Sequence, residues 1–151
     1  MKYRQGVDHP GKDGPRKYPS GTRPRAPLVL LVDDLDDSRD MYAEMLRRAG
    51  YRVVEAENGV EALRQARAER PAIVVMDLSM PVMDGWEAMR KLRADPRTNG
   101  IPTIALTGVG LTGHAEAMSS GCVAFLVKPC APQDLVGVVD MTLNAAEAVE
   151  A

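Results

Sequence analysis

The chain alternates short aliphatic runs with helix-like segments, and this alternation constrains the fold more than any other feature. Five runs are expected to be strands, over residues 28–32, 51–56, 72–76, 103–106 and 123–127. After each run, apolar residues recur at helical spacing. Unbroken apolar runs are typical of parallel strands buried on both faces. The pattern therefore predicts an α/β fold: a doubly wound parallel sheet of five strands with five helices.

The expected helices begin at residues that can cap or open a helix. The first opens near Asp37 and Ser38, whose side-chain oxygens can accept hydrogen bonds from free backbone N–H groups. The second opens at Asn58, with Glu61 three residues later as in a capping box. The other three are expected after Asp84-Gly85, over about 112–120, and from Pro132 onward.

Polar side chains stand at the carboxyl ends of four of the expected strands. They are Asp33 and Asp34, Asp77, Thr107 and Lys128. The carboxyl ends of parallel strands meet at one edge of the sheet, where open α/β sheets bind ligands. These side chains are therefore expected to converge on one small cleft. Three carboxylates, a hydroxyl and an ammonium suit a divalent metal and a phosphoryl group.

The chemistry of such a cleft follows from the residue types. Three crowded carboxylates repel one another, and Mg²⁺ relieves this repulsion because it prefers hard oxygen ligands completed by water. Asp77 is the expected nucleophile, a carboxylate that attacks a phosphodonor and becomes an acyl phosphate. The metal and Lys128 then offset charge on the phosphoryl oxygens. The alternatives are a helix-capping role for Asp77 and a plain surface position for Lys128.

Residues 28–146 resemble the receiver domain of the two-component response regulators. The motifs that carry the resemblance occur in the family's order: Asp33-Asp34, Asp77 to Pro81 followed by Asp84-Gly85, Thr107-Gly108, and Lys128-Pro129. The intervals are close to the usual ones: 43 residues from Asp34 to Asp77, 30 to Thr107 and 21 to Lys128. The resemblance implies a flavodoxin-like sheet with strand order 2-1-3-4-5.

The resemblance also implies roles for individual residues. Mg²⁺ would be bound directly by Asp34, Asp77 and the backbone carbonyl of Ser79, with Asp33 acting mainly through water. Asp77 is then the phosphoacceptor, assisted by Thr107 and Lys128.

A conformational switch is implied at Thr107 and Phe125. In the family the hydroxyl at the Thr107 position moves to the phosphoryl group, and the aromatic residue at the Phe125 position turns into the vacated space. This remodels the face made by the fourth helix, the fifth strand and the fifth helix. Phe125 lacks the phenolic hydroxyl of the commoner Tyr, so burial alone sets its preference. The alternative is an ordinary core Phe.

Two departures from the family pattern bear on function. The interval from Thr107 to Lys128 is one residue shorter than is typical, and the loss falls in a glycine-rich segment. Val109 stands where many relatives carry a polar residue that positions the hydrolytic water. We expect slow loss of phosphate and a shorter lifetime in Val109→Glu, measured as the decay of the phosphorylated protein. An unchanged decay rate would contradict this expectation.

The first 27 residues differ in composition from the rest. They carry seven Lys and Arg against two Asp, with five Pro and four Gly, whereas the whole chain has a net charge of −2. Such a leader buries too little to offset its ordering entropy and is expected to be disordered. Three interpretations of this leader remain open. It is a solvated tail, a segment that contacts an acidic partner or the domain's own acidic face, or a segment that attaches to nucleic acid. The last is disfavoured because no folded basic module accompanies it.

Other classes of site and location are also constrained. No apolar run approaches the roughly 20 residues of a membrane span, and no secretory signal is evident, so the protein is expected in the cytoplasm. Cys122 and Cys130 are expected to be free thiols. His9 and His114 are far apart in sequence, which disfavours a zinc site.

The resulting hypothesis is a single-domain response regulator with a short tail at 147–151. It accepts a phosphoryl group on Asp77 from a histidine kinase or phosphotransfer protein, and signals through a phosphorylation-dependent protein contact on the switch face. It is not an enzyme beyond self-directed phosphoryl transfer and slow autodephosphorylation. Open alternatives are a phosphorylation-independent scaffold and a receiver detached from a larger hybrid kinase. A phosphatase acting on outside substrates is disfavoured, since no lid or second acid is evident.

Overall fold

Five parallel strands form the sheet of the computed structural model, which describes residues 26–78, 80, 83–108, 118–119 and 121–150. The strands are β2 (Leu28–Val32), β3 (Arg52–Ala56), β4 (Ile73–Asp77), β5 (Thr103–Thr107) and β6 (Ala124–Val127). Their order across the sheet is β3-β2-β4-β5-β6, and each neighbouring pair is parallel. In chain order this is 2-1-3-4-5, so the predicted topology is confirmed.

The strand bounds follow the sequence prediction closely. β2 has the predicted bounds, and the other four strands differ from prediction by one residue at one or both ends. At β4 and β5 the difference has a consequence for the site, because Asp77 and Thr107 are the last residues of these strands. In the parallel ladder Asp77 pairs with Leu106, and Thr107 pairs with Val127.

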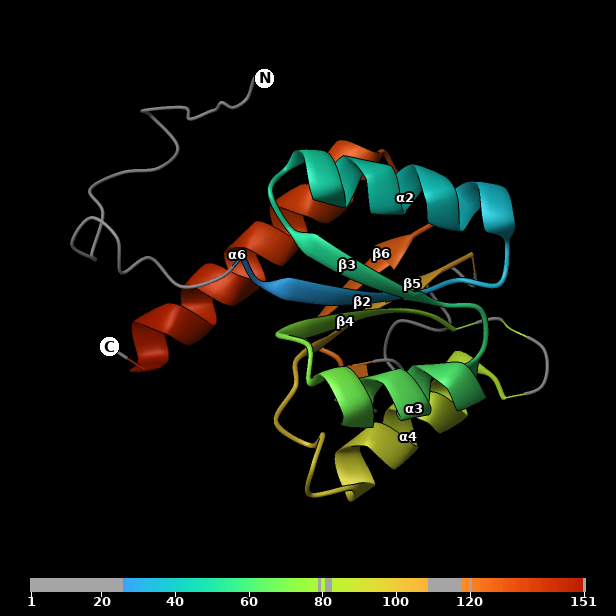
Figure 1. Ribbon diagram of the computed structural model, residues 1–151, viewed down its shortest axis with the longest axis vertical. Helices are drawn as coiled ribbons and strands as arrows, with labels where there is room; N and C mark the ends of the chain where they lie inside the picture. The colour runs from blue at the N-terminus through green and yellow to red at the C-terminus, as the bar shows by residue number, and fades with distance from the viewer. Residues whose placement is uncertain (1–25, 79, 81–82, 109–117, 120, 151) are drawn as a thin grey trace.

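Helices cover both faces of the sheet (Figure 1). They are α2 (Asp36–Arg48), α3 (Gly59–Glu69), α4 (Gly85–Ala94) and α6 (Pro132–Glu150). In Figure 1, α2 and α6 lie on one side of the sheet and α3 and α4 on the other. The fifth predicted helix, about 112–120, falls almost wholly outside the described residues. None of the helices within the described ranges is long and apolar enough to cross a membrane.

The two ends of the chain are described only in part. The basic leader lies outside the described residues up to position 25, so its disorder stays a prediction. At the other end, α6 continues to Glu150, into the segment that the sequence assigned to a short tail.

Two of the helices begin as capped helices should. The side-chain oxygen Oδ1 of Asn58 accepts a hydrogen bond from the backbone N–H of Glu61 at 2.8 Å, which confirms the predicted cap of α3. Asp84 caps α4 in the same way, through the backbone N–H of Glu87 at 2.9 Å. Each cap fixes where the chain leaves the loop after a strand and turns into the helix.

The predicted cap of α2 is wrong. The helix begins at Asp36, its N-cap residue is Leu35, and no side chain makes a capping hydrogen bond there. Asp37 and Ser38 therefore lie inside the first turn. The Ser38 hydroxyl instead donates to the Asp33 carboxylate. The start of α2 is thus tied to the residue that follows β2.

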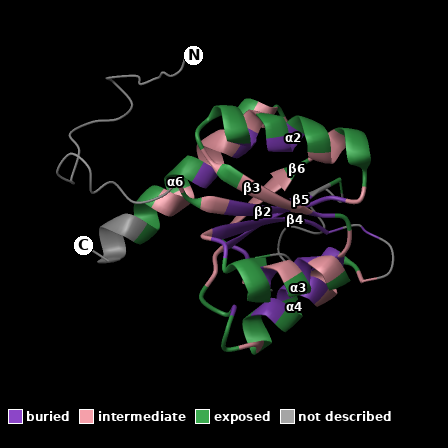
Figure 2. Ribbon diagram, in the orientation of Figure 1, coloured by how far each residue is buried: buried purple, intermediate pink, exposed green. Residues whose placement is uncertain are grey.

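The core has two layers, one on each face of the sheet. Alternate residues of β4 belong to opposite layers, because successive side chains of a strand point to opposite faces. Ile73 and Val75 pack with residues of α2 and α6, whereas Val74 and Met76 pack with residues of α3 and α4. Figure 2 shows burial concentrated in the central strands. The unbroken apolar runs of the sequence are explained by this burial on both faces.

An acidic cluster at the carboxyl edge of the sheet

Three carboxylates meet where β2 and β4 end. Asp33 and Asp34 follow β2 directly, and Asp77 is the last residue of β4. These two strands are neighbours in the sheet, and their register pairs Val32 with Met76. Extending the register by one residue sets Asp33 beside Asp77. One oxygen of each of the three carboxylates lies within 4.8 Å of the other two. The structure thus brings the three predicted acids together.

Burial makes this cluster electrostatically costly. The exposed fraction is 0% for Asp33 and 4% for Asp77, and Asp34 is half-buried. Asp33 and Asp77 are buried because they stand at the ends of β2 and β4, which are interior strands of the sheet. Carboxylates that are buried beside like charges lose solvation and repel each other. The cluster therefore needs compensating positive charge.

Lys128 supplies one part of that charge. It follows β6 directly, and its Nζ donates to Oδ2 of Asp33 at 3.1 Å and to Oδ2 of Asp77 at 3.4 Å. Burial lowers the pKa of the Lys128 ammonium, but hydrogen bonds and Coulombic attraction to the two carboxylates outweigh burial and raise the pKa above its ordinary value. Lys128 is therefore charged at neutral pH. Three carboxylates and one ammonium leave two net negative charges in the cluster.

The residues present fit Mg²⁺. The cluster offers three carboxylate oxygens close enough to share one ion, and carboxylate oxygens are the hard ligands that Mg²⁺ prefers. A divalent cation matches the two net negative charges. Ser79, whose carbonyl the resemblance implied as a further ligand, lies outside the described residues, so its part stays a prediction.

Hydrogen bonds fix both the backbone and the side chain of Asp33. Its Oδ1 accepts a hydrogen bond from the backbone N–H of Leu35 at 3.0 Å, and its Oδ2 accepts one from the Ser38 hydroxyl at 2.6 Å. Its carbonyl oxygen accepts a hydrogen bond from Nη1 of Arg39 at 2.7 Å. Sequence reasoning missed this use of Ser38 and overlooked Arg39 altogether. The only signal was their place on the first turn of the helix that follows the acidic pair.

Gly85 packs against the backbone of the phosphoacceptor candidate. A Cβ at this position would lie 2.2 Å from the carbonyl oxygen of Asp77 and 2.6 Å from the Cα of Leu78. The backbone N–H of Gly85 also donates to the carbonyl oxygen of Leu78 at 3.2 Å. The two residues of the Asp84-Gly85 pair therefore have different structural roles. Asp84 caps α4, and Gly85 allows α4 to pack closely against the end of β4.

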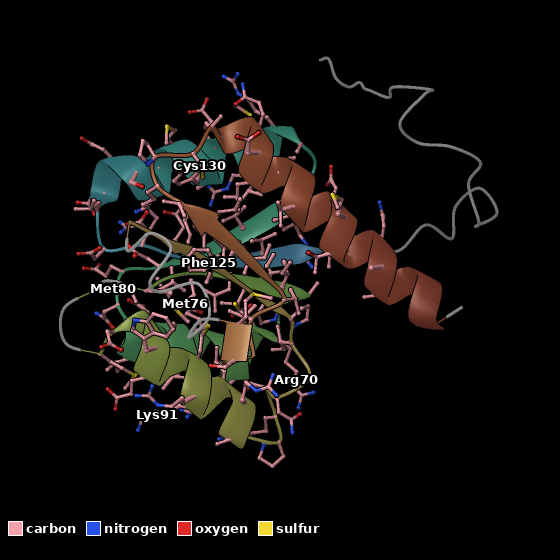
Figure 3. The ribbon with its side chains drawn as sticks, turned by 180° about the vertical axis from the view of Figure 1, so that it is seen from behind. Arg70, Met76, Met80, Lys91, Phe125 and Cys130 are labelled. Atoms are coloured by element: carbon pink, nitrogen blue, oxygen red, sulfur yellow. The ribbon has the colours of Figure 1, made fainter. Side chains whose placement is uncertain are left out.

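The switch residues are placed only in part. Thr107 ends β5, next to β4, so its backbone reaches the same edge of the sheet as Asp77. Phe125 is half-buried on β6 and packs against the core layer that contains Met76 and Met80, as Figure 3 shows. The switching role of both residues stays a prediction. Val109 lies outside the described residues.

The two cysteines are free, as expected. Cys122 is buried, and burial raises the pKa of its thiol. Cys130 lies beside α2 in Figure 3, where the Tyr42 hydroxyl donates to its carbonyl oxygen at 3.0 Å. Burial, helped by the contacts with Cys130, raises the pKa of Tyr42. This contact ties α2 to the loop that carries Lys128.

Comparison with known proteins gives a consistent result. The model of the response regulator receiver domain matches residues 29–140. Response regulator Rre1 of Synechocystis sp. is 37% identical over 113 residues, which cover 74% of this chain and 49% of Rre1, so the chain spans about half the length of that relative. Polar-differentiation response regulator DivK of Brucella anthropi is 32% identical over 102 residues, covering 67% of this chain and 83% of DivK.

Solved structures agree with the sequence relatives. The receiver domain of sensor histidine kinase PA1611 from Pseudomonas aeruginosa PAO1 has a TM-score of 0.73 and 32% identity, over 79% of this chain and 98% of the other; that structure holds a magnesium ion in its active-site cleft. Chemotaxis protein CheY4 of Vibrio cholerae has a TM-score of 0.72 and 32% identity, over 77% of this chain and 98% of the other.

Proposed function

The chain belongs to the response regulator receiver domain family of two-component systems, and from that premise we propose that Asp77 is its phosphoacceptor. The observation that carries the proposal is the position of Asp77, buried at the end of an interior strand beside Lys128, Asp33 and Asp34. The phosphodonor is a histidine kinase or a phosphotransfer protein. Members of the family are signalling phosphoacceptors rather than ordinary enzymes.

The transfer step uses Asp77 and Lys128, which are both in the acidic cluster. An oxygen of the Asp77 carboxylate attacks phosphorus, the bond from phosphorus to the donor nitrogen breaks, and its electron pair leaves with the imidazole. The product is an acyl phosphate on Asp77. The Lys128 ammonium, 3.4 Å from Oδ2 of Asp77, is placed to donate to the phosphoryl oxygens as charge develops on them.

Asp34 and Asp77 would bind Mg²⁺ directly, with Asp33 reaching it mainly through water and Ser79 adding its carbonyl. When bound, the ion supplies positive charge that lets the phosphoryl oxygens approach an acidic cluster. The protein's own part is to hold the three carboxylates within reach of one ion. Because the three carboxylates outnumber the Lys128 ammonium, we expect a reaction with an anionic donor to require the cation.

The output is a protein contact that depends on phosphorylation. Thr107 moves to the phosphoryl group, Phe125 turns inward, and the face that includes β6 and α6 changes shape. The packing of Phe125 against the layer that holds Met76 and Met80 supports this, because methionine side chains adapt readily to a moving neighbour.

Intact mass measures phosphoryl acceptance directly. We expect the chain to gain the mass of one phosphoryl group after incubation with Mg²⁺ and acetyl phosphate, and to gain none when EDTA removes the cation. Phosphoramidate serves as a second small donor. If folded protein that binds Mg²⁺ gains no mass from either donor, the proposal is contradicted, and a phosphorylation-independent scaffold becomes the better account.

A further inference from the structure

The Asp33 carboxylate is almost fully engaged by hydrogen bonds. Its Oδ1 accepts from the backbone N–H of Leu35, and its Oδ2 accepts from both the Ser38 hydroxyl and the Lys128 ammonium. A carboxylate has about four acceptor sites, two on each oxygen. Among the described residues, Ser38 and Lys128 are the donors to Oδ2 and Leu35 is the donor to Oδ1, which leaves one acceptor site on Oδ1. The rotation of the carboxylate decides where that site lies.

The Ser38 hydroxyl is the donor best placed to set this rotation. Its distance of 2.6 Å to Oδ2 lies in the range of short, charge-assisted hydrogen bonds. Lys128 has a long flexible stem and shares its ammonium with Asp77, so it cannot fix Asp33 alone. Leu35 contacts only the other oxygen.

The first turn of α2 gives Ser38 a rigid base. Arg39, the next residue, is 14% exposed at its side chain and donates to the Asp33 carbonyl oxygen at 2.7 Å. The same guanidinium forms ion pairs with Asp36 at 2.8 Å and with Glu55 of β3 at 3.2 Å. Through Arg39, the first turn of α2 is therefore bonded to Asp33 at the end of β2 and to Glu55 of β3. The hydroxyl of Ser38 does not depend on the Lys128 loop for its position.

We infer that Ser38 is a positioning residue of the cation site: its hydroxyl fixes the Asp33 carboxylate, and through the shared Oδ2 it also fixes the Lys128 ammonium. The inference rests on the proposed function, because it concerns the same cluster. In this inference Ser38 acts through Asp33 and is not a ligand of the cation. It would leave the remaining acceptor site of Oδ1 available to a bound cation or to its water.

Loss of the hydroxyl is expected to weaken Mg²⁺ binding. In Ser38→Ala, Lys128 is the donor that remains to Oδ2 among the described residues, and the carboxylate can turn about its contact with Leu35. Residues that orient metal-binding groups typically contribute 10- to 100-fold in affinity. Because Asp33 is proposed to act mainly through water, we expect the low end, a dissociation constant about ten-fold higher.

Calorimetric titration of the full chain with MgCl₂, without a phosphodonor, tests the inference. Ser38→Ala is compared with the parent and with Ser38→Thr, which keeps the hydroxyl and should restore the dissociation constant. Thr142→Ala is the matched control, because it removes a hydroxyl that donates to the Val138 carbonyl at 2.8 Å within α6. We expect this control to bind Mg²⁺ as the parent does. Thermal unfolding of each variant checks that the fold is retained.

The outcomes separate the inference from the proposed function. If the parent binds Mg²⁺ and Ser38→Ala binds it equally well, the inference alone is overturned. A loss that Ser38→Thr does not restore, or that Thr142→Ala shares, would assign the effect to packing and overturn it as well. If the parent binds no Mg²⁺, the cation site of the proposed function fails too.

Discussion

Asp77→Asn is expected to abolish phosphoryl addition from acetyl phosphate and also to stabilise the Mg²⁺-free protein. The first effect follows because an amide cannot act as the carboxylate nucleophile that forms an acyl phosphate. Intact mass of the parent and the variant, incubated side by side with Mg²⁺ and donor, measures it. A variant that still gains one phosphoryl group would move the acceptor to another residue and contradict the assignment of Asp77.

The second effect follows from the balance of charges in the cluster. The substitution removes the attraction between Asp77 and Lys128, but it also removes repulsion between Asp77 and two carboxylates and the cost of burying a charge. We expect relief of the repulsion and of the burial cost to outweigh the loss of the contact with Lys128. We expect the free energy of unfolding to rise by about 1 kcal/mol in EDTA, which corresponds to about 3 °C in the unfolding midpoint.

Asp37→Asn is the matched control for stability. It makes the same chemical change at an exposed position on the first turn of α2, where a surface substitution typically changes stability by less than about 0.5 kcal/mol. Added Mg²⁺ should reverse the order of midpoints, because ligand binding stabilises the parent more than a variant with one carboxylate fewer. A lower midpoint for Asp77→Asn in EDTA would show that the Lys128 contact outweighs the repulsion.

The arrangement of the acidic cluster could be predicted because its residues stand at the carboxyl ends of strands. Once residues 28–32 and 72–76 are identified as neighbouring parallel strands, the side chains that follow them must meet at one edge. The apolar runs predict that both segments are strands buried on both faces, and the strand order that the family resemblance implies makes them neighbours. Asp33, Asp34, Asp77 and the backbone of Thr107 lie where this reasoning puts them. Lys128 reaches them from the edge strand through its long side chain.

The details that the sequence did not reveal depend on side-chain rotation and on close contacts between distant segments. Serine is a common helix-capping residue. Nothing in the sequence indicates that the Ser38 hydroxyl instead donates a hydrogen bond to Asp33. The bond from Tyr42 to the Cys130 carbonyl joins residues 88 positions apart, so no local pattern signals it. Together these contacts show that α2 supports the cluster at both the Asp33 end and the Lys128 loop.

Gly85→Ala is expected to be among the most damaging small substitutions in the chain. The added Cβ would meet the carbonyl oxygen of Asp77 at 2.2 Å, and this atom belongs to the backbone of an interior strand that cannot give way cheaply. Either α4 moves outward or the end of β4 shifts. We expect a loss of about 3 kcal/mol in the free energy of unfolding, the upper range for overpacking.

The same substitution should slow phosphorylation, because the contact lies directly behind the phosphoacceptor. A displacement of about 1 Å in a reacting group can reduce rates about a hundred-fold. We therefore expect a drop of that order in the rate of mass gain with acetyl phosphate, at a temperature where the variant is folded. Circular dichroism at that temperature establishes the folded fraction.

Gly137→Ala provides the control within the same chain. Gly137 lies in α6, and apart from its chain neighbours and the adjacent backbone of the helix, no atom of the described residues lies within 4 Å of a Cβ placed there. Alanine at such a helix position should stabilise by about 0.5–1 kcal/mol, with the phosphorylation rate unchanged. The two substitutions add the same methyl group, so opposite signs would isolate the effect of the contact with Asp77. If Gly85→Ala is as stable as the parent and is phosphorylated at the parental rate, the packing of α4 behind Asp77 does not position the nucleophile.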